Sequence, residues 1–184
     1  LETLGVPLDK RGLPTVHPQT LQIGDLPVFL AGDANTHAPL LHEAADEGHI
    51  AGMNALADTP TTFQRRTPLG IVFCDPQIAT AGRRLADLDP DHTITGSASY
   101  ANQGRARTAQ LNHGGIRIHA HRTTGQLQGA ELCAPHAEHM AHLLALAIQQ
   151  KLTVHDLLGM PFYHPTLEEG LRTALRDAAR QSAS

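Results

Sequence analysis

Residues 166–179 carry the clearest structural pattern in the sequence. Thr166 and Glu169 form a capping box, in which the Thr166 hydroxyl accepts the Glu169 N–H and the Glu169 carboxylate reaches back to the start of the turn. Apolar residues then recur at three- and four-residue steps along one side of the segment. They are Leu167, Leu171, Ala174, Leu175 and Ala178. The pattern predicts an amphipathic helix that ends near Ala179 and buries one of its faces.

Strand-like segments precede the helix-like ones in this part of the chain. Short runs with β-type composition lie at residues 69–74, 78–81, 115–120 and 127–132. Residues 122–125, Arg-Thr-Thr-Gly, suit a hairpin loop between the last two runs. Helical spacing follows at residues 136–150, and Thr153 and Asp156 can cap a further short helix. This order predicts an α+β fold, with an antiparallel sheet and helices on one of its faces.

The beginning of the chain has a different, α/β pattern. The apolar run Pro27–Ala31 is typical of a short buried strand, and helical spacing extends from Pro39 to about Ala57. The Pro- and Thr-rich residues 58–68 predict a connector. We therefore expect a small α/β part over residues 1–60 and the α+β domain over residues 61–184.

Composition excludes several classes of protein. The chain has 14 Lys and Arg against 18 Asp and Glu, a formal net charge of -4, which disfavours nucleic-acid binding. No apolar run approaches the roughly 18 residues needed to cross a bilayer, and no charged-then-apolar leader opens the chain. These features predict a soluble, cytoplasmic protein that binds no membrane. Because the sequence begins with Leu1 rather than Met, we expect a fragment of a longer protein.

Cysteines and clustered histidines give no strong metal signal. Cys74 and Cys133 are far apart and have no partner at metal or redox-motif spacing, and Cys74 lies in an apolar run that predicts a buried core thiol. His136, His139 and His142 occur every three residues, so a metal site is an alternative to a polar helix flank. On a helix the first and third would lie roughly 120° apart, which is too far for one ion, and we expect no metal site.

A carboxylate follows the predicted buried strand. Gly32 and Asp33 come directly after residues 27–31, and a helix is expected to begin near Pro39. A carboxylate at the carboxyl end of a buried strand can accept hydrogen bonds from a ligand hydroxyl, and N–H groups at a helix start attract negative charge. This geometry suits a polyol or flavin-type ligand. The alternative is an ordinary turn that ends the strand.

An acid/base pair is predicted just before the last helix. Pro165 disfavours helical dihedral angles at His164 and holds this residue in an extended segment. An imidazole changes charge near neutral pH, so His164 can serve as a general base or acid. Glu169 could orient the imidazole and stabilise its protonated form. The alternative is structural, with Glu169 as a helix cap and His164 as one of 13 histidines.

Residues 28–35, Val-Phe-Leu-Ala-Gly-Asp-Ala-Asn, resemble the Gly-Asp motif of the flavoprotein disulfide reductases with two dinucleotide-binding domains. This resemblance implies that Asp33 binds the ribityl chain of FAD. It also implies that the helix beginning at Leu40, Leu41 and His42 presents its N–H groups to the pyrimidine edge of the flavin.

Residues 164–169, His-Pro-Thr-Leu-Glu-Glu, resemble the His-Pro-Thr-Leu-x-Glu signature of the dihydrolipoamide dehydrogenase family. There the His and Glu form a dyad that one subunit lends to the active site of the other. The resemblance implies that His164 takes a proton from a dithiol such as dihydrolipoamide, because only the thiolate attacks the disulfide of a Cys pair beside the flavin. Residues 69–82 and 102–106 are similar to segments of the same family's dimerisation domain, whereas Phe162 and Tyr163 differ from its usual His and Ala.

Taken together, these resemblances imply a homodimeric, FAD- and NAD-dependent oxidoreductase. Residues 1–60 would be the C-terminal part of its FAD-binding and central region, and residues 61–184 its dimerisation domain. Neither the Cys pair nor a Gly-x-Gly-x-x-Gly motif occurs in this sequence, so we expect the fragment alone to be inactive and cofactor-free. A yellow purified sample would contradict that expectation. The alternative is a non-catalytic dimerisation module of a related flavoprotein, similar to soluble transhydrogenase or mercuric reductase.

Overall fold

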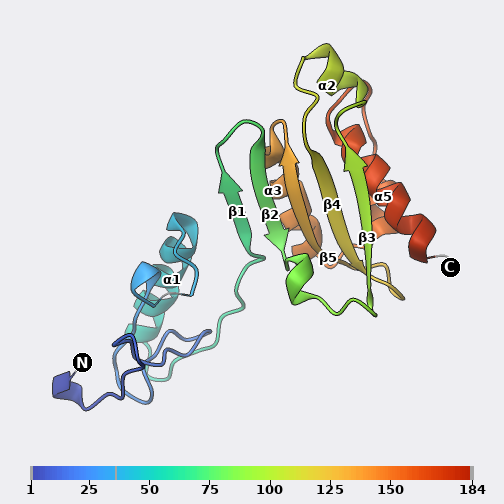
Figure 1. The fold of residues 1–184 in the computed structure, drawn as a ribbon. Coiled ribbons are helices and arrows are strands. Elements are labelled where there is room, and N and C mark those ends of the chain that lie inside the picture. Colours follow the sequence, from blue (N-terminus) through green and yellow to red (C-terminus); the bar gives the residue numbers. More distant parts are fainter. Residues whose placement is uncertain (1, 36, 183–184) are drawn as a thin grey trace. The chain divides into compact units, whose positions relative to one another are not determined.

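The computed structural model describes residues 2–35 and 37–182, which form two compact units. Unit 1 extends to Arg65 and unit 2 begins at Arg66, so the division falls within the Pro- and Thr-rich connector (Figure 1). No helix in the described ranges is both long and apolar enough to span a membrane.

Unit 2 is built on a five-stranded antiparallel sheet with the order β1-β2-β5-β4-β3 (Figure 1). Its strands are β1 (Leu69–Val72), β2 (Gln77–Gly82), β3 (Thr93–Ser99), β4 (Gly115–His121) and β5 (Leu127–Ala134). Residues 122–126 join β4 to β5 as the predicted hairpin, and the register places Arg117 opposite Glu131. The loop is stabilised by the His121 ring, whose Nδ1 accepts the N–H groups of Thr123 and Thr124 at 3.3 Å.

Two long helices cover one face of this sheet. The helix α3 (Ala137–Gln149) packs against β2 and β5, and α5 (Glu168–Ser182) packs against β3 and β4. The short helices α2 (Gly104–Thr108) and α4 (Val154–Leu158) complete the unit, and α4 begins with the predicted capping box of Thr153 and Asp156. The core contains the apolar stripe predicted for the last helix, because Leu171, Ala174, Leu175 and Ala178 are all fully buried. The predicted α+β fold with helices on one face is confirmed.

Strand β3 was not predicted. Its sequence, Thr-Ile-Thr-Gly-Ser-Ala-Ser, has only one large apolar residue, Ile94, and several small ones. The small residues are required by the helix above them, because a Cβ at Gly96 would lie 2.6 Å from the Ala178 nitrogen and still closer to the Ala174 carbonyl oxygen. Gly96 therefore allows α5 to approach β3 closely.

The prediction that Cys74 is a buried core thiol is wrong. Strand β1 ends at Val72, and Cys74 lies in the turn to β2, where its thiol contacts the Pro76 carbonyl at 3.2 Å and is exposed. The apolar run in the sequence continues past the end of the strand, so apolar composition alone does not show where burial ends.

The described residues of unit 1 form one long helix, α1 (Leu41–Ala55), and two short 3-10 helices, η1 (Glu2–Leu4) and η2 (Gly32–Asn35). Its described residues pair only through isolated bridges, such as Gln22 with Phe29. The buried strand predicted at Pro27–Ala31 is therefore not formed, and residues 28–30 are only half-buried. A buried strand needs continuous partners on both sides, and a single bridge does not supply them.

Candidate functional site

His164 and Glu169 are in contact. The imidazole Nδ1 lies 2.9 Å from Glu169 Oε2, within hydrogen-bond distance. The His164 side chain is 78% exposed, whereas that of Glu169 is only 14% exposed. Because Nδ1 faces the carboxylate, Nε2 is the ring nitrogen that can exchange a proton with a reacting group.

The Glu169 carboxylate is shared among several donors. Its Oε1 accepts a 2.8 Å hydrogen bond from Arg172, and its Oε2 accepts the Thr166 N–H at 3.3 Å. The Arg172 guanidinium in turn lies 5.6 Å from the centre of the Phe162 ring, a cation–π distance. Burial raises the pKa of Glu169, but the Thr166 N–H, His164 and Arg172 together hold it below its ordinary value. The carboxylate is therefore ionised at neutral pH, as an orienting partner of an imidazole must be.

One half of the predicted capping box is present at this helix start. The Glu169 carboxylate reaches back to the Thr166 N–H, and the Thr166 hydroxyl donates to the Tyr163 carbonyl at 2.9 Å. Glu169 thus both caps α5 and holds His164, so the structural and the acid/base interpretations of this residue are compatible.

Residues from a distant segment fix the backbone between His164 and Glu169. The Gln103 side chain donates to the Thr166 carbonyl at 2.6 Å and accepts the Ala106 N–H at 2.6 Å, as the N-cap of α2. The Tyr100 hydroxyl, on a fully buried side chain, donates to the Leu167 carbonyl at 3.1 Å. Through these contacts Gln103 and Tyr100 hold the backbone of the His164–Glu169 segment in place. Neither residue was predicted as a site residue.

The lowered pKa of Glu169 predicts a pH-dependent contribution to stability. Its ordinary value is 4.5, and because the folded value is lower, the ionised carboxylate stabilises the fold above about 4.5 and loses this effect as the pH falls through the folded pKa. We expect Glu169→Gln to destabilise unit 2 most at neutral pH and progressively less in acid. Urea unfolding over a pH series measures this difference. The neighbouring Glu168→Gln variant is the control, and a Glu169→Gln effect that stays constant into acid would contradict the prediction.

Of the residues predicted to bind FAD, Leu40, Leu41 and His42 lie at the start of α1, and Asp33 lies in a turn that packs against this helix. Asp33 is exposed within η2, which packs against α1. Leu40 is the N-cap of α1 and makes no side-chain capping bond, so no side chain of Leu40 competes for the first N–H groups of the helix. Leu41 is 89% exposed and His42 is exposed as well. An exposed carboxylate can accept hydrogen bonds from the hydroxyls of a polyol chain, and N–H groups at a helix start can donate to a carbonyl oxygen, so the two groups fit the ribityl chain and the pyrimidine edge of a flavin.

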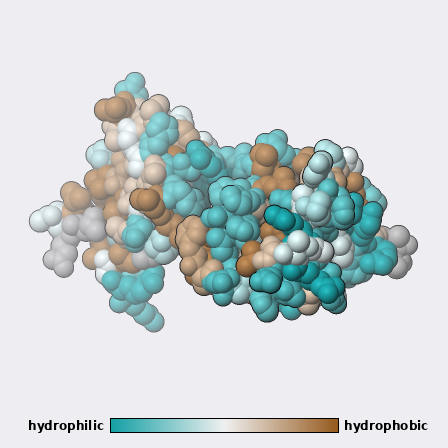
Figure 2. All heavy atoms as spheres, turned by 90° about the horizontal axis from the view of Figure 1, so that it is seen from above, coloured by the Kyte–Doolittle hydropathy of each residue, from teal (hydrophilic) through white to brown (hydrophobic). Residues whose placement is uncertain are grey.

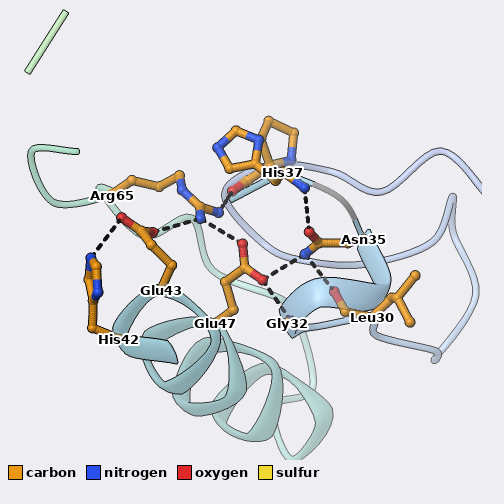
Figure 3. A network of polar contacts seen from close by, with 9 residues as sticks. Leu30, Gly32, Asn35, His37, His42, Glu43, Glu47 and Arg65 are labelled. Atoms are coloured by element: carbon orange, nitrogen blue, oxygen red, sulfur yellow. Dashed lines mark hydrogen bonds and ion pairs between the residues drawn. The ribbon is translucent and has the colours of Figure 1, made fainter. Parts of the chain in front are cut away.

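A buried carboxylate holds this turn to the helix (Figure 3). Glu47, on α1, has a side chain that is 1% exposed, and its Oε2 accepts hydrogen bonds from the Gly32 N–H and the Asn35 side chain, both at 2.7 Å. Its Oε1 accepts a 2.6 Å bond from Arg65. Burial raises the pKa of Glu47, but the bonds from Arg65, Gly32 and Asn35 lower it below its ordinary value. Nothing in the sequence pattern predicted this role, because its partners lie 12, 15 and 18 residues away.

The sheet face opposite α3 and α5, here called the outer face, carries Val72, Ile78, Arg117, Glu131 and Cys133. Ile78 and Cys133 form a register pair near one end of β2 and β5, and both are exposed. A shallow hollow of about 620 Å³ lies over it, lined by Ile78, Arg117, Glu131 and Cys133 among others. Apolar side chains also reach the surface elsewhere among polar ones, as Figure 2 shows for one side of the molecule.

The histidines at the start of α3 and along it have other contacts in the structure. His136 and His139 stack with ring centres 6.3 Å apart, and the His142 Nδ1 contacts the Glu138 carbonyl at 2.7 Å. Across residues 2–35 and 37–182, no three His, Cys, Asp or Glu side chains are grouped so that they could hold a metal ion.

Comparisons with known proteins agree on the class of this domain. Residues 69–175 match the family model of the pyridine nucleotide-disulphide oxidoreductase dimerisation domain. The dihydrolipoyl dehydrogenase of Haloferax volcanii is 29% identical over 185 residues, which cover 99% of this chain and 38% of that protein. The mercuric reductase of Acidithiobacillus ferrooxidans is 29% identical over 182 residues, covering 98% of this chain and 33% of that protein.

The fold agrees with solved structures. The crystal structure of LpdA from Mycobacterium tuberculosis superposes with a TM-score of 0.80 at 28% identity, over 95% of this chain and 38% of that one. The flavoprotein disulfide reductase RclA from Escherichia coli shares the fold, with a TM-score of 0.78 at 18% identity, over 94% of this chain and 40% of that one.

Unit 2 thus contains the dimerisation domain that characterises the pyridine nucleotide-disulphide oxidoreductases. The chain belongs to the pyridine nucleotide-disulphide oxidoreductase family, and it spans 33–38% of the length of the curated relatives described above.

Proposed function

We propose that this chain is the C-terminal part of an FAD- and NAD-dependent oxidoreductase that oxidises a dithiol such as dihydrolipoamide. In this proposal His164 and Glu169 are the acid/base dyad that one subunit lends to its partner. The observation that carries the proposal is the 2.9 Å contact between an exposed imidazole and a largely buried carboxylate. Turnover by a His164→Gln variant of the full-length protein tests it, since an unchanged rate of dithiol oxidation would refute an acid/base role.

The chemistry assigned to the dyad is a proton transfer. His164 Nε2 takes the proton of a substrate thiol, and the resulting thiolate attacks one sulfur of the enzyme's disulfide, which leaves a mixed disulfide and a second thiolate. Glu169 stabilises the imidazolium that forms, and Arg172 keeps the carboxylate in place through its 2.8 Å bond. Exposure of His164 favours a site completed by another chain.

FAD would be held by Asp33 on its ribityl chain and by the N–H groups at the start of α1. The exposure of Asp33, Leu40, Leu41 and His42 and the uncapped helix start support this assignment. When bound, the flavin would accept the electron pair from the dithiol and pass it to NAD. This chain's residues would contribute binding and orientation. The two free, exposed cysteines support action in a reducing compartment such as the cytoplasm.

The proposed homodimer uses the outer face of the sheet. An isologous interface uses the same surface patch of both copies, so one introduced charge is buried twice in each dimer. We expect the 19.7 kDa chain to sediment as a dimer, and Ile78→Lys to weaken dimerisation by more than about 100-fold, since each dimer would bury two unpaired ammonium groups. Ile78 is 45% exposed on this face, opposite Cys133.

Leu146→Lys provides the matched control for this experiment. Leu146 is also an exposed apolar residue, but it lies on α3. Sedimentation of only a 19.7 kDa species at high concentration, or equal effects of the two variants, would contradict the proposed interface.

A second candidate is a non-catalytic dimerisation module. It is favoured by the capping bond from Thr166 to Glu169, which gives the carboxylate a structural use, and by Phe162 and Tyr163 at positions where the signature usually has other residues. In this case His164→Gln would leave turnover unchanged while dimerisation persists.

A further inference from the structure

We propose that Glu47 is a positioning residue for FAD, which sets the place of Asp33 by clamping the turn on both sides of it. This inference rests on the proposed function, because it concerns the flavin site assigned there. Glu47 itself touches no ligand in this account. It acts through the backbone that carries the ribityl-binding carboxylate.

The geometry of the clamp carries the argument (Figure 3). The Oε2 atom of Glu47 accepts hydrogen bonds from the Gly32 N–H and from the Asn35 side chain, each at 2.7 Å. Gly32 immediately precedes Asp33 in the sequence, and Asn35 follows Asp33 by two residues. Asp33 therefore lies between two fixed points while its own side chain remains exposed. The backbone of this turn also requires a glycine, because Gly32 has φ 75°, in the left-handed region that other residues rarely adopt.

The second oxygen anchors the clamp. Arg65 donates to Glu47 Oε1 at 2.6 Å, and the same guanidinium nitrogen lies 3.1 Å from Glu43 Oε2. A buried carboxylate with a full set of donors keeps a fixed orientation, because any rotation would leave a charge unpaired away from water. Since α1 carries both Glu47 and the helix start at Leu41, the clamp fixes the two proposed flavin contacts relative to each other.

If the ion pairs of Arg65 with Glu43 and Glu47 only stabilised the fold, loss of either carboxylate should have the same effect on FAD binding. They lie one turn apart on α1 and share Arg65, but only Glu47 reaches Gly32 and Asn35. Glu43→Gln is therefore the matched control, because it removes one partner of Arg65 and leaves the turn connected.

The experiment compares the full-length protein with its Glu47→Gln, Asn35→Ala and Glu43→Gln variants. The readouts are the dissociation constant of FAD, from the absorbance and fluorescence of bound flavin, and the hydrogen exchange of the Gly32 amide. We expect Glu47→Gln to weaken FAD binding by roughly 10- to 100-fold, the range seen when the partner that orients a metal-ligating side chain is lost. Gly32 exchange should accelerate in parallel. Asn35→Ala should act in the same direction, and it carries the test if Glu47→Gln fails to fold.

Each outcome decides the matter. Weak binding confined to Glu47→Gln and Asn35→Ala supports the inference. Wild-type affinity in both variants, or an equal loss in Glu43→Gln, overturns it while leaving the flavin site intact. A wild-type protein that binds no FAD overturns the proposed function and this inference together.

Discussion

Replacing His164 with glutamine should lower the rate of dithiol oxidation by the full-length protein by roughly 10²- to 10⁴-fold, the usual contribution of a positioned acid/base group. Glutamine has a similar size and can still contact Glu169, but it cannot take up a proton. The loss should therefore appear in turnover, whereas flavin absorbance and sedimentation should remain those of the wild type. Stopped-flow reduction of the flavin by the dithiol measures the affected step directly.

His155→Gln is the control for this variant. His155 is also an exposed histidine of unit 2, on α4, whereas the Glu169 carboxylate bonds to His164, Thr166 and Arg172. Its substitution should leave turnover unchanged. A His164→Gln enzyme that reduces its flavin as fast as the wild type would show that the pair only caps α5.

Replacing Gly96 with alanine should destabilise unit 2 by about 3 kcal/mol or more, at the upper end of the usual cost of overpacking. The added Cβ would lie 2.6 Å from the Ala178 backbone nitrogen and 2.7 Å from the Ala178 Cβ, which is fixed to the same helix backbone, so neither atom can move without the helix. Either α5 must move away from β3 or the strand must distort. Because α5 carries Glu169, the same substitution should also reduce the order of the His164 segment. Denaturant unfolding of the 184-residue chain gives the free energy.

Gly104→Ala is the matched control for this substitution. A Cβ at Gly104, the first residue of α2, meets no atom within 4 Å. Alanine should be neutral or slightly stabilising there, since it restricts the unfolded chain. A Gly96→Ala chain as stable as the Gly104→Ala chain would show that the contact between β3 and α5 is looser than described.

Elements with strong periodicity could be predicted from the sequence. The last helix was predicted from its capping pattern and its apolar stripe, and the structure buries Leu171 and Leu175 as expected. The hairpin of β4 and β5 followed from two β-rich runs around a short polar loop. In these segments local propensity and tertiary packing agree.

Elements that depend on tertiary partners could not be predicted. Strand β3 is composed of small residues because α5 lies against it, and such a sequence has no strand signal by itself. The run Pro27–Ala31 has a strong strand signal but only isolated bridge partners. Cys74 lies in an apolar segment but beyond the end of β1. Burial in these places is decided by neighbours distant in the sequence.

In the candidate site, the reacting pair could be predicted from the sequence, but the residues that position it could not. His164 and Glu169 are five residues apart, so their pairing could be proposed from the sequence and its resemblance to a known signature. The residues that hold them could not, because Gln103 lies 63 residues from Thr166, and Tyr100 lies 67 from Leu167. Glu47 is a further example, since a charged helix residue is usually solvated.

A mixed dimer of the full-length protein tests most directly whether His164 and Glu169 act in the active site of the other subunit. One subunit carries His164→Gln, and the other carries serine in place of the proposed redox-active cysteines. If the dyad acts across the two-fold axis, one of the two sites combines intact cysteines with an intact dyad, so the mixed dimer should oxidise the dithiol although both parent dimers are inactive. A mixed dimer with no activity above that of its parents would contradict this account.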